Sequence, residues 1–226
     1  MLEMAVACAF LLLTHFGLSS TPLRAQLAGA VGEQGFQGIY SLIALAALGY
    51  CIWLYSDLPR LEYFWYPNPD LYWVPKVLMP LAAILAFGGF LVKNPTQVGM
   101  EKVLAAEAFE STGLLRVTRH PFMWGVVLWG LSHLIVNGDA VSVVFFSTFI
   151  VLAGVGTLLM DRKKAASLGD GWPPFAAQTS NVPFGAILSG RNKLAVGELW
   201  QPAVVGLVVW GLMFYFHEWL SGVPLI

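Results

Sequence analysis

The chain has 226 residues, of which 58% are hydrophobic and only 11% are charged, and its mean hydropathy is +0.71. Soluble globular domains carry about 25% charged residues, so the composition excludes an ordinary soluble domain and predicts a membrane protein in contact with membrane lipids. A net charge of −1 without a basic cluster argues against a nucleic-acid partner.

Six apolar, uncharged runs follow one another along the chain, and each approaches the roughly 20 residues that a helix needs to cross the hydrocarbon core. In chain order they are Met4–Ser20, Ile39–Tyr55, Val77–Val92, Phe122–Val136, Ala140–Met160 and Leu199–His217. The sequence therefore predicts an all-α, polytopic membrane helix bundle of about six transmembrane helices, forming a single domain over residues 1–226.

The ends of these runs carry helix-breaking residues, such as Thr21-Pro22 after the first run. Between the fourth and fifth runs, Asn137-Gly138-Asp139 predicts a tight turn and hence an antiparallel helical hairpin. Asp139 is expected to cap the fifth helix by accepting from its free N–H groups.

The uneven distribution of lysine and arginine predicts how the chain is oriented in the membrane. All lysines and arginines except Arg60 and Lys76 fall in the connections after the first, third and fifth runs. The positive-inside rule then places both termini on the periplasmic side, and Glu3 in place of a basic start favours retention of the first helix as a span.

Two smaller features are interpreted structurally. Cys8 and Cys51 fall in different runs at different expected depths, so we expect buried packing residues and no disulfide. The aromatic stretch from Leu61 to Pro75 predicts an interfacial belt, with a lid over a cofactor or carotenoid as the alternative.

Histidine is the informative residue type here. The four histidines, His15, His120, His133 and His217, all lie in or at the ends of predicted spans. Ionisable side chains in spans tend to face the bundle interior, paired or liganded. Two interpretations of each histidine stay open. It is either a neutral imidazole hydrogen-bonded to a neighbouring backbone or hydroxyl group, or a cofactor ligand. Two imidazoles that face each other across a helical bundle would hold a b-type haem.

From one end to the other, the chain resembles the NnrU family of bacterial integral membrane proteins, and part of the pattern is similar to 15-cis-zeta-carotene isomerase. The resemblance is carried by "THFGLSSTPLR" (14–24), "GLLRVTRHPFMWGVVLWGLSHLIVNGD" (113–139), "DRKKAASLGDGWPPFAAQTSNVPF" (161–184) and "FHEWLSGVP" (216–224).

This resemblance implies a multi-pass protein of the bacterial inner membrane that supports nitrite and nitric oxide respiration (denitrification), beside nitrogen-oxide reductase machinery. The isomerase uses haem b, and its haem ligands fall on His15 and His133, which the resemblance therefore implies as metal ligands. The isomerase has a cysteine where this chain has Gly130. A thiolate ligand at that position is excluded.

The estimated depths of the histidines along their helices favour a different pair of haem ligands. A rise of 1.5 Å per residue places His15 and His133 about 10 Å apart in depth, whereas His15 and His120 agree better. In that arrangement Arg119 would meet the haem propionates. The second ligand is therefore His133 by resemblance or His120 by depth.

The Arg119-His120-Pro121 element, at the start of a hairpin, also resembles membrane methyltransferases that bind S-adenosylmethionine. Their paired glutamate is missing, because Asp161 is followed by three cations and is expected to form a local charge cluster. A purely structural alternative has Arg119 and His120 in the headgroup region while Pro121 starts the helix.

Four functions stay open from the sequence. They are a haem b protein that either supports nitrogen-oxide respiration or carries out haem-dependent redox conversion of a lipophilic substrate, a carotenoid-type isomerase, a methyltransferase, and a non-enzymatic accessory protein.

Overall fold

The computed structural model describes all residues except 19–20, 98, 101–102, 104–108 and 224–226. Every regular element in the described residues is helical, and the extended pairing found there is one isolated bridge between Tyr63 and Asp139. The predicted all-α class is confirmed.

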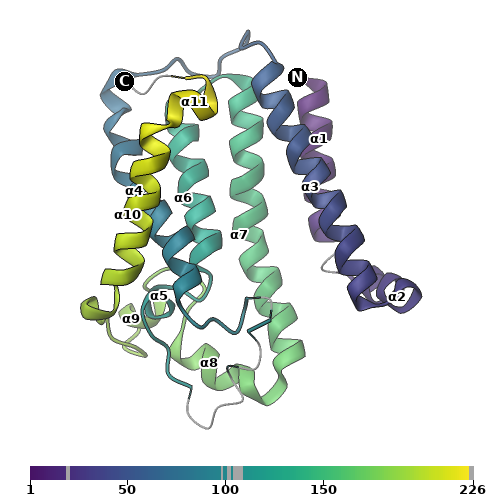
Figure 1. Cartoon of the computed structure of the whole chain (residues 1–226), viewed down its shortest axis with the longest axis vertical. Coiled ribbons are helices and arrows are strands. Elements are labelled where there is room, and N and C mark those ends of the chain that lie inside the picture. The colour runs from purple at the N-terminus through teal and green to yellow at the C-terminus, as the bar shows by residue number, and fades with distance from the viewer. Residues whose placement is uncertain (19–20, 98, 101–102, 104–108, 224–226) are drawn as a thin grey trace.

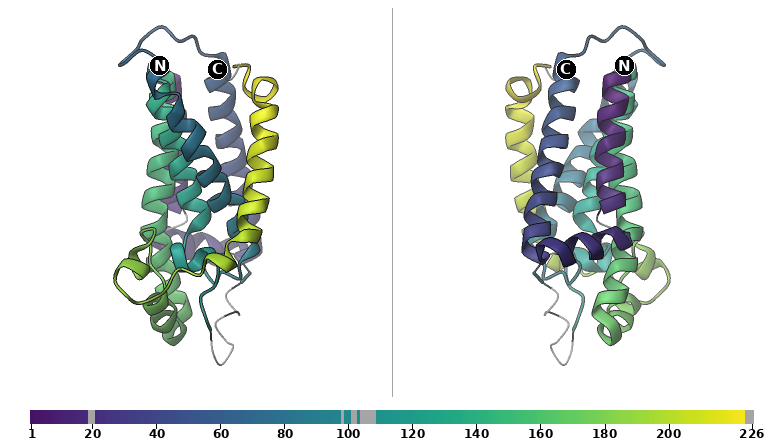
Figure 2. Two further views of the ribbon diagram at one scale, coloured as in Figure 1. Left: turned by 90° about the vertical axis from the view of Figure 1, so that its left-hand side faces the viewer. Right: turned by 90° about the vertical axis from the view of Figure 1, so that its right-hand side faces the viewer.

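The N-terminal helices form one side of the molecule (Figure 1). Helix α1 (Leu2–Leu13) continues as a π-helical turn (Thr14–Leu18), and α2 (Pro22–Val31) is bent from this segment by 78°. Helix α2 lies across the end of the bundle (Figure 2), before α3 (Glu33–Asp57) runs back beside α1. Ser19 and Ser20, the end of the first predicted span, lie outside the described residues.

The remaining long helices pack together as the larger part of the bundle. They are α4 (Trp73–Gly88), α6 (Pro121–Val136), α7 (Ala140–Leu168) and α10 (Trp200–Tyr215), followed by the short α11 (His217–Ser221). We call the end of the bundle at Asn137–Asp139 the hairpin end. The opposite end, called the basic end, carries α5 (Leu114–Val117), α8 (Trp172–Gln178) and α9 (Gly185–Leu188).

Single 3-10 turns complete the structure. They are Pro69–Leu71, Gly89–Leu91, Gly169–Gly171 and Val196–Glu198.

Glycines at helix crossings allow these helices to pack closely. A Cβ atom added to Gly125 of α6 would lie 2.7 Å from the backbone oxygen of Ala82 in α4, and one added to Gly130 would lie 2.7 Å from Cγ1 of Ile150 in α7. Gly206 of α10 packs directly on the backbone of α4. Small residues at such crossings are typical of helix association in membranes, where backbones approach closely.

Three helical segments are long and apolar enough to cross a membrane, namely Glu33–Asp57, Pro69–Leu91 and Ala140–Gln178. The bent α1–α2 pair makes a fourth if it counts as one span. Helices α6 and α10 are apolar but shorter, with 16 residues each. All six predicted runs are therefore helical over most of their described residues, and three to four of them have the length of a membrane span.

The predicted hairpin and its cap are confirmed. Helices α6 and α7 pack side by side, and Oδ1 of Asp139 accepts a hydrogen bond from the backbone N–H of Ser142 at 2.9 Å. The loop after α3 is fixed to this hairpin, because the N–H of Phe64 donates to the carbonyl of Gly138 and the N–H of Ala140 donates to that of Glu62, each at 2.8 Å.

The expected depth difference between the two cysteines is wrong. Cys8 and Cys51 are both buried, have free thiols and contact each other in the core that joins α1, α3 and α7. The physical reason is the antiparallel course of α1 and α3. Cys8 lies six residues after the start of α1, and Cys51 lies six residues before the end of α3, at the same side of the bundle.

Candidate functional site

His15 and His133 lie in different surroundings. Nδ1 of His15 lies 2.9 Å from the carbonyl oxygen of Leu11, and its ring meets Tyr40 of α3 edge-on at 5.7 Å. Nδ1 of His133 lies 2.9 Å from the carbonyl oxygen of Trp129, and its ring stacks on Phe146 of α7 at 4.9 Å. The two histidines thus pack against different helices.

Their levels in the bundle also differ. Helix α1 starts, and α6 ends, at the hairpin end (Figure 1). His15 comes thirteen residues after Leu2, whereas His133 comes three residues before Val136. At 1.5 Å of rise per residue, this separates them by roughly 15 Å along the bundle.

Both axial nitrogens of one haem must bind the same iron atom. The arrangement of His15 and His133 does not fit that requirement, and within the described residues no group of three or more histidine, cysteine, aspartate or glutamate side chains is placed to hold a metal ion. Haem binding by this chain stays a prediction.

His120 is engaged within the protein. Its side chain is buried at the start of α6, and Nε2 lies 2.7 Å from Oδ1 of Asp161 in α7. Asn181 donates to the other carboxylate oxygen of Asp161 at 3.0 Å, and Nη1 of Arg119 lies 3.6 Å from that same oxygen. Asp161 therefore pairs with His120 and Arg119 rather than only with the cations that follow it in the sequence.

The backbone around Arg119 is held equally firmly. Its carbonyl accepts from the side-chain amide of Asn94 at 2.9 Å, its N–H donates to the carbonyl of Ser180 at 2.9 Å, and its guanidinium lies over the ring of Trp172. Burial lowers the pKa of Arg119, and the Asp161 carboxylate opposes this shift. Pro121 starts α6 as expected, but Arg119 and His120 are buried in contacts within the protein rather than placed in the headgroup region, and Nε of Arg119 has no hydrogen-bond partner among the described residues.

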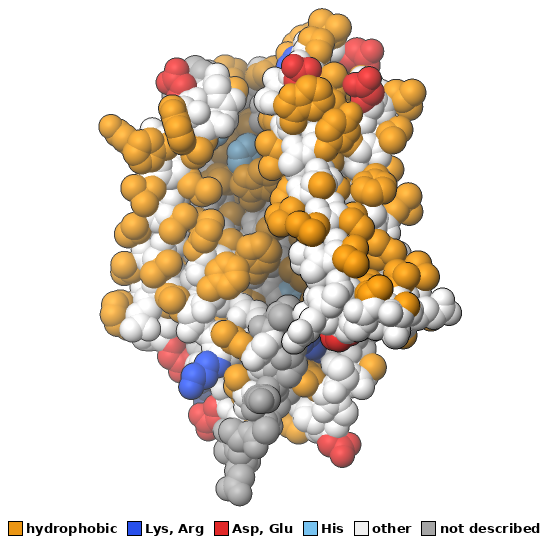
Figure 3. Space-filling model, turned by 45° about the vertical axis from the view of Figure 1, so that its right-hand side comes forward, with side chains coloured by type: hydrophobic (Ala, Val, Ile, Leu, Met, Phe, Trp, Pro, Cys, Tyr) orange, Lys and Arg blue, Asp and Glu red, His pale blue; other side chains and the backbone are white. Residues whose placement is uncertain are grey.

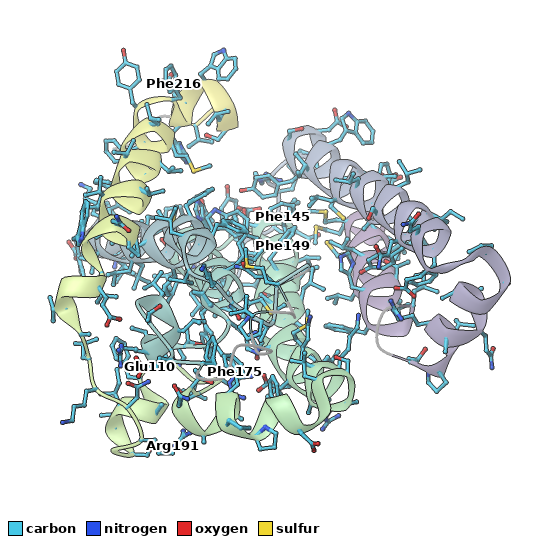
Figure 4. The ribbon with its side chains drawn as sticks, turned by 60° about the horizontal axis from the view of Figure 1, so that its bottom comes forward. Glu110, Phe145, Phe149, Phe175, Arg191 and Phe216 are labelled. Atoms are coloured by element: carbon cyan, nitrogen blue, oxygen red, sulfur yellow. The ribbon has the colours of Figure 1, made fainter. Side chains whose placement is uncertain are left out.

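The basic end is closed by aromatic packing below this element. Phe175 of α8 is fully buried against Phe109 and Trp172. Figure 4 shows Phe175 under the bundle, near Glu110, while Phe145 and Phe149 of α7 lie further inside. Arg191 fixes the loop beside it by donating to three backbone carbonyls.

A cavity of about 320 Å³ opens near the hairpin end between α4, α6 and α10. Its wall is mostly apolar and includes Pro67, Tyr72, Met79, Val136, Trp210 and Phe214. Five polar side chains join them, namely Lys76, Ser132, His133, Asn137 and His217. Figure 3 shows a hollow in the hydrophobic surface with a histidine side chain inside it.

From the sequence, His217 was expected only to lie at the end of a predicted span, and its place in this cavity was not predicted. Nδ1 of His217 lies 3.0 Å from the carbonyl oxygen of Val223 and 3.1 Å from Oγ of Ser221. The structure thus brings His217 and His133 to one cavity, while His15 and His120 lie elsewhere. No local sequence signal marks this meeting, because it depends on how α10 packs on α4.

The described residues form an all-helical membrane protein with a mostly apolar cavity that two histidines line. Comparison with known sequences identifies the family of the chain. The chain belongs to the NnrU protein family, whose model matches residues 3–225.

Two curated relatives are similar to this chain. The chloroplastic 15-cis-zeta-carotene isomerase of Zea mays is 32% identical over 113 residues, which are 48% of this chain and 31% of the relative. That of Arabidopsis thaliana is 27% identical over 187 residues, 80% of this chain and 49% of the relative. The chain thus spans less than half the length of these relatives. No solved structure matches it significantly.

Proposed function

We propose that the protein is a multi-pass membrane enzyme of the isomerase type, which takes a lipophilic substrate from the bilayer into the cavity between α4, α6 and α10. The observation that carries the proposal is the position of His133 in this mostly apolar cavity. The similarity to two isomerases supports the reaction type.

The proposal includes six crossings, with both termini on the periplasmic side of a bacterial inner membrane. Helices α6 and α10 are about 24 Å long by their rise, against a hydrocarbon core of about 30 Å. Each packs along α4, one of the helices that is long enough to span. The exposed Trp219, which follows α10, would lie at the membrane interface and complete that crossing.

His133 is suited to act on a bound substrate because its ring is fixed. Stacking on Phe146 and the hydrogen bond from Nδ1 to the carbonyl of Trp129 hold its orientation. A carbonyl oxygen only accepts, so Nδ1 carries the hydrogen and Nε2 is left for proton exchange with a ligand. We assign His133 the role of an acid–base group that, once protonated at Nε2, donates this proton to the double bond and takes it back after rotation, with no net change in protons.

The test uses the relatives' substrate. The protein is reconstituted in liposomes with 15-cis-zeta-carotene, and loss of the 15-cis isomer is followed by chromatography. We expect conversion by the wild type and a decrease of roughly 100-fold in His133→Phe, the usual size of an acid–base contribution. Phe preserves the stacking on Phe146.

Tyr50→Phe, on the exposed surface of α3, is the matched control and should convert normally. Equal conversion by His133→Phe and wild type would refute the role of His133. No conversion by any of the three would refute the isomerase proposal for this substrate.

The other functions have less support. S-adenosylmethionine binding has less support because Nη2 of Arg119 donates to the carbonyl of Thr179 and Nε2 of His120 meets Asp161, although Nε of Arg119 has no partner among the described residues. Roles in nitrite and nitric oxide respiration, as a haem protein or as an accessory protein, stay predictions, and co-purification with a nitrogen-oxide reductase would favour the accessory role.

A further inference from the structure

We propose that the preferred ligand of the cavity is a lipophilic alcohol, with its hydroxyl group held by Ser132, His133 and His217 and its hydrocarbon part along the apolar wall. This inference rests on the proposed function only in taking the cavity as the ligand site. It specifies that the ligand is an alcohol, because a pure hydrocarbon forms no hydrogen bonds with these side chains.

Ser132 supplies the first observation. Its side chain is 0% exposed, it lines the cavity, and its Oγ has no hydrogen-bond partner among the described residues. Buried hydroxyls in native proteins are almost always paired, and a helical serine commonly bonds the carbonyl four residues earlier. A hydroxyl that is buried and unpaired at a cavity wall is therefore a donor that a ligand can satisfy.

The two histidines supply the complementary group. Nδ1 of His133 faces the carbonyl of Trp129, and Nδ1 of His217 faces the carbonyl of Val223. Each Nδ1 must therefore donate, so in the neutral rings each Nε2 offers only a lone pair. The cavity thus contains hydrogen-bond acceptors as well as the donor at Ser132.

Lys76 adds a second donor at the same wall. It lies near the start of α4 and lines the cavity, and its ammonium group is in no ion pair with the described residues. A ligand that matches this set must both accept from Ser132 or Lys76 and donate to an imidazole. A hydroxyl group does both, an aldehyde oxygen only accepts, and a hydrocarbon does neither.

The rest of the cavity fits a hydrocarbon chain. Met79, Val136, Trp210 and Phe214 provide an apolar wall, and the volume of about 320 Å³ lies at the lower end of the range for ligand sites. A short isoprenoid fits the cavity, and a longer one extends into the bilayer.

The experiment compares three ligands of one carbon skeleton. The protein in nanodiscs of mixed phosphatidylcholine and phosphatidylglycerol is labelled with a diazirine analogue of farnesol, and labelled peptides are identified by mass spectrometry. Unlabelled farnesol, farnesal and farnesene compete for labelling. We expect label on α6 and α10, and competition in the order farnesol, farnesal, farnesene, with each lost hydrogen bond weakening competition roughly threefold to tenfold.

Two variants test the assigned groups. Ser132→Ala and His217→Phe should each reduce the advantage of farnesol over farnesene, and Ser132→Ala should do so without lowering thermal stability, because it removes an unpaired buried hydroxyl. Ser56→Ala, at an exposed position of α3, is the matched control and should keep the full preference.

The outcomes separate the two proposals. Equal competition by farnesol and farnesene overturns the alcohol preference while the isomerase proposal survives. Labelling that falls as the phosphatidylglycerol content rises, with no preference among the three competitors, would mean that a phospholipid occupies the cavity and also overturns it. No label on α6 or α10 would remove the ligand site on which both proposals rest.

Discussion

Nε2 of His120 and the carboxylate of Asp161 meet at 2.7 Å, which ties the start of α6 to the part of α7 nearest the basic end. Asn181 and Arg119 share the same carboxylate. This cluster joins two helices and the loop after α8 at one point.

Removing the carboxylate should therefore destabilise the protein. Asp161→Ala leaves the buried His120 and Arg119 without their shared partner. We expect a loss of about 1–3 kcal/mol, since the Asp161 side chain is partly exposed and the full cost of a broken buried pair does not apply. Thermal unfolding in detergent measures it. The exposed Asp170→Ala is the control, and an equal effect of the two changes would contradict the assigned role.

Glu198 should make stability depend on acid pH. Its carboxylate accepts from Nε and Nη2 of Arg116 and from the N–H of Gly113, and these hydrogen bonds lower the pKa of Glu198 below its ordinary value. The stabilisation is fully present above the unfolded pKa of about 4.3 and is lost as pH falls through the lower folded value.

Glu198→Gln should accordingly be less stable than the wild type at pH 7. The difference should shrink as pH falls through the lowered folded pKa of Glu198, because below it both side chains are uncharged. Unfolding temperatures measured across this range check the expectation, with the exposed Glu218→Gln as a control that shows no such convergence. A difference that is independent of pH would argue against the ion pair.

The contact between Cys8 and Cys51 predicts a cross-link. Mild oxidation of the purified protein should join the two thiols within one chain, because their side chains are neighbours in the core. Mass spectrometry of the digested protein detects the linked peptides, which should be absent in Cys51→Ser. Only intermolecular links, or none, would show that α1 and α3 are not paired in this register.

The crossing of α6 and α4 should not tolerate a larger residue. Gly125→Ala places a methyl group 2.7 Å from a backbone oxygen of α4, and we expect a loss of about 1–3 kcal/mol from overpacking. Gly154→Ala in α7 has open space around it and should be neutral or slightly stabilising, because alanine favours a helix more than glycine does. Unfolding measurements on the two variants compare them, and similar values would count against the close crossing.

Local sequence patterns were sufficient to predict much of the fold. The six apolar runs are helices, and Asn137–Asp139 forms the predicted hairpin, because hydrophobic periodicity and helix caps are written in consecutive residues. The 25-residue length of α3 and the crossing helix α2 were not predicted. Both depend on where the chain turns at the membrane boundary.

The site was less predictable, because its residues meet through packing between distant segments. The pairing of His120 with Asp161 had a usable signal, since residues at similar distances from a hairpin turn lie at the same level. His217 had none, because its approach to His133 depends on the packing of Gly206 against α4.

The loop after α3 is pinned to the α6–α7 hairpin by two backbone hydrogen bonds and by the bond from Nε1 of Trp65 to the carbonyl of Ile135. The same loop contributes Pro67 to the cavity wall. For the lipophilic ligand proposed above, we therefore expect entry sideways, through the lipid between the helices. Its occupancy follows the mole fraction of ligand in the bilayer, so that diluting a membrane preparation with water leaves binding unchanged while adding empty lipid vesicles depletes it.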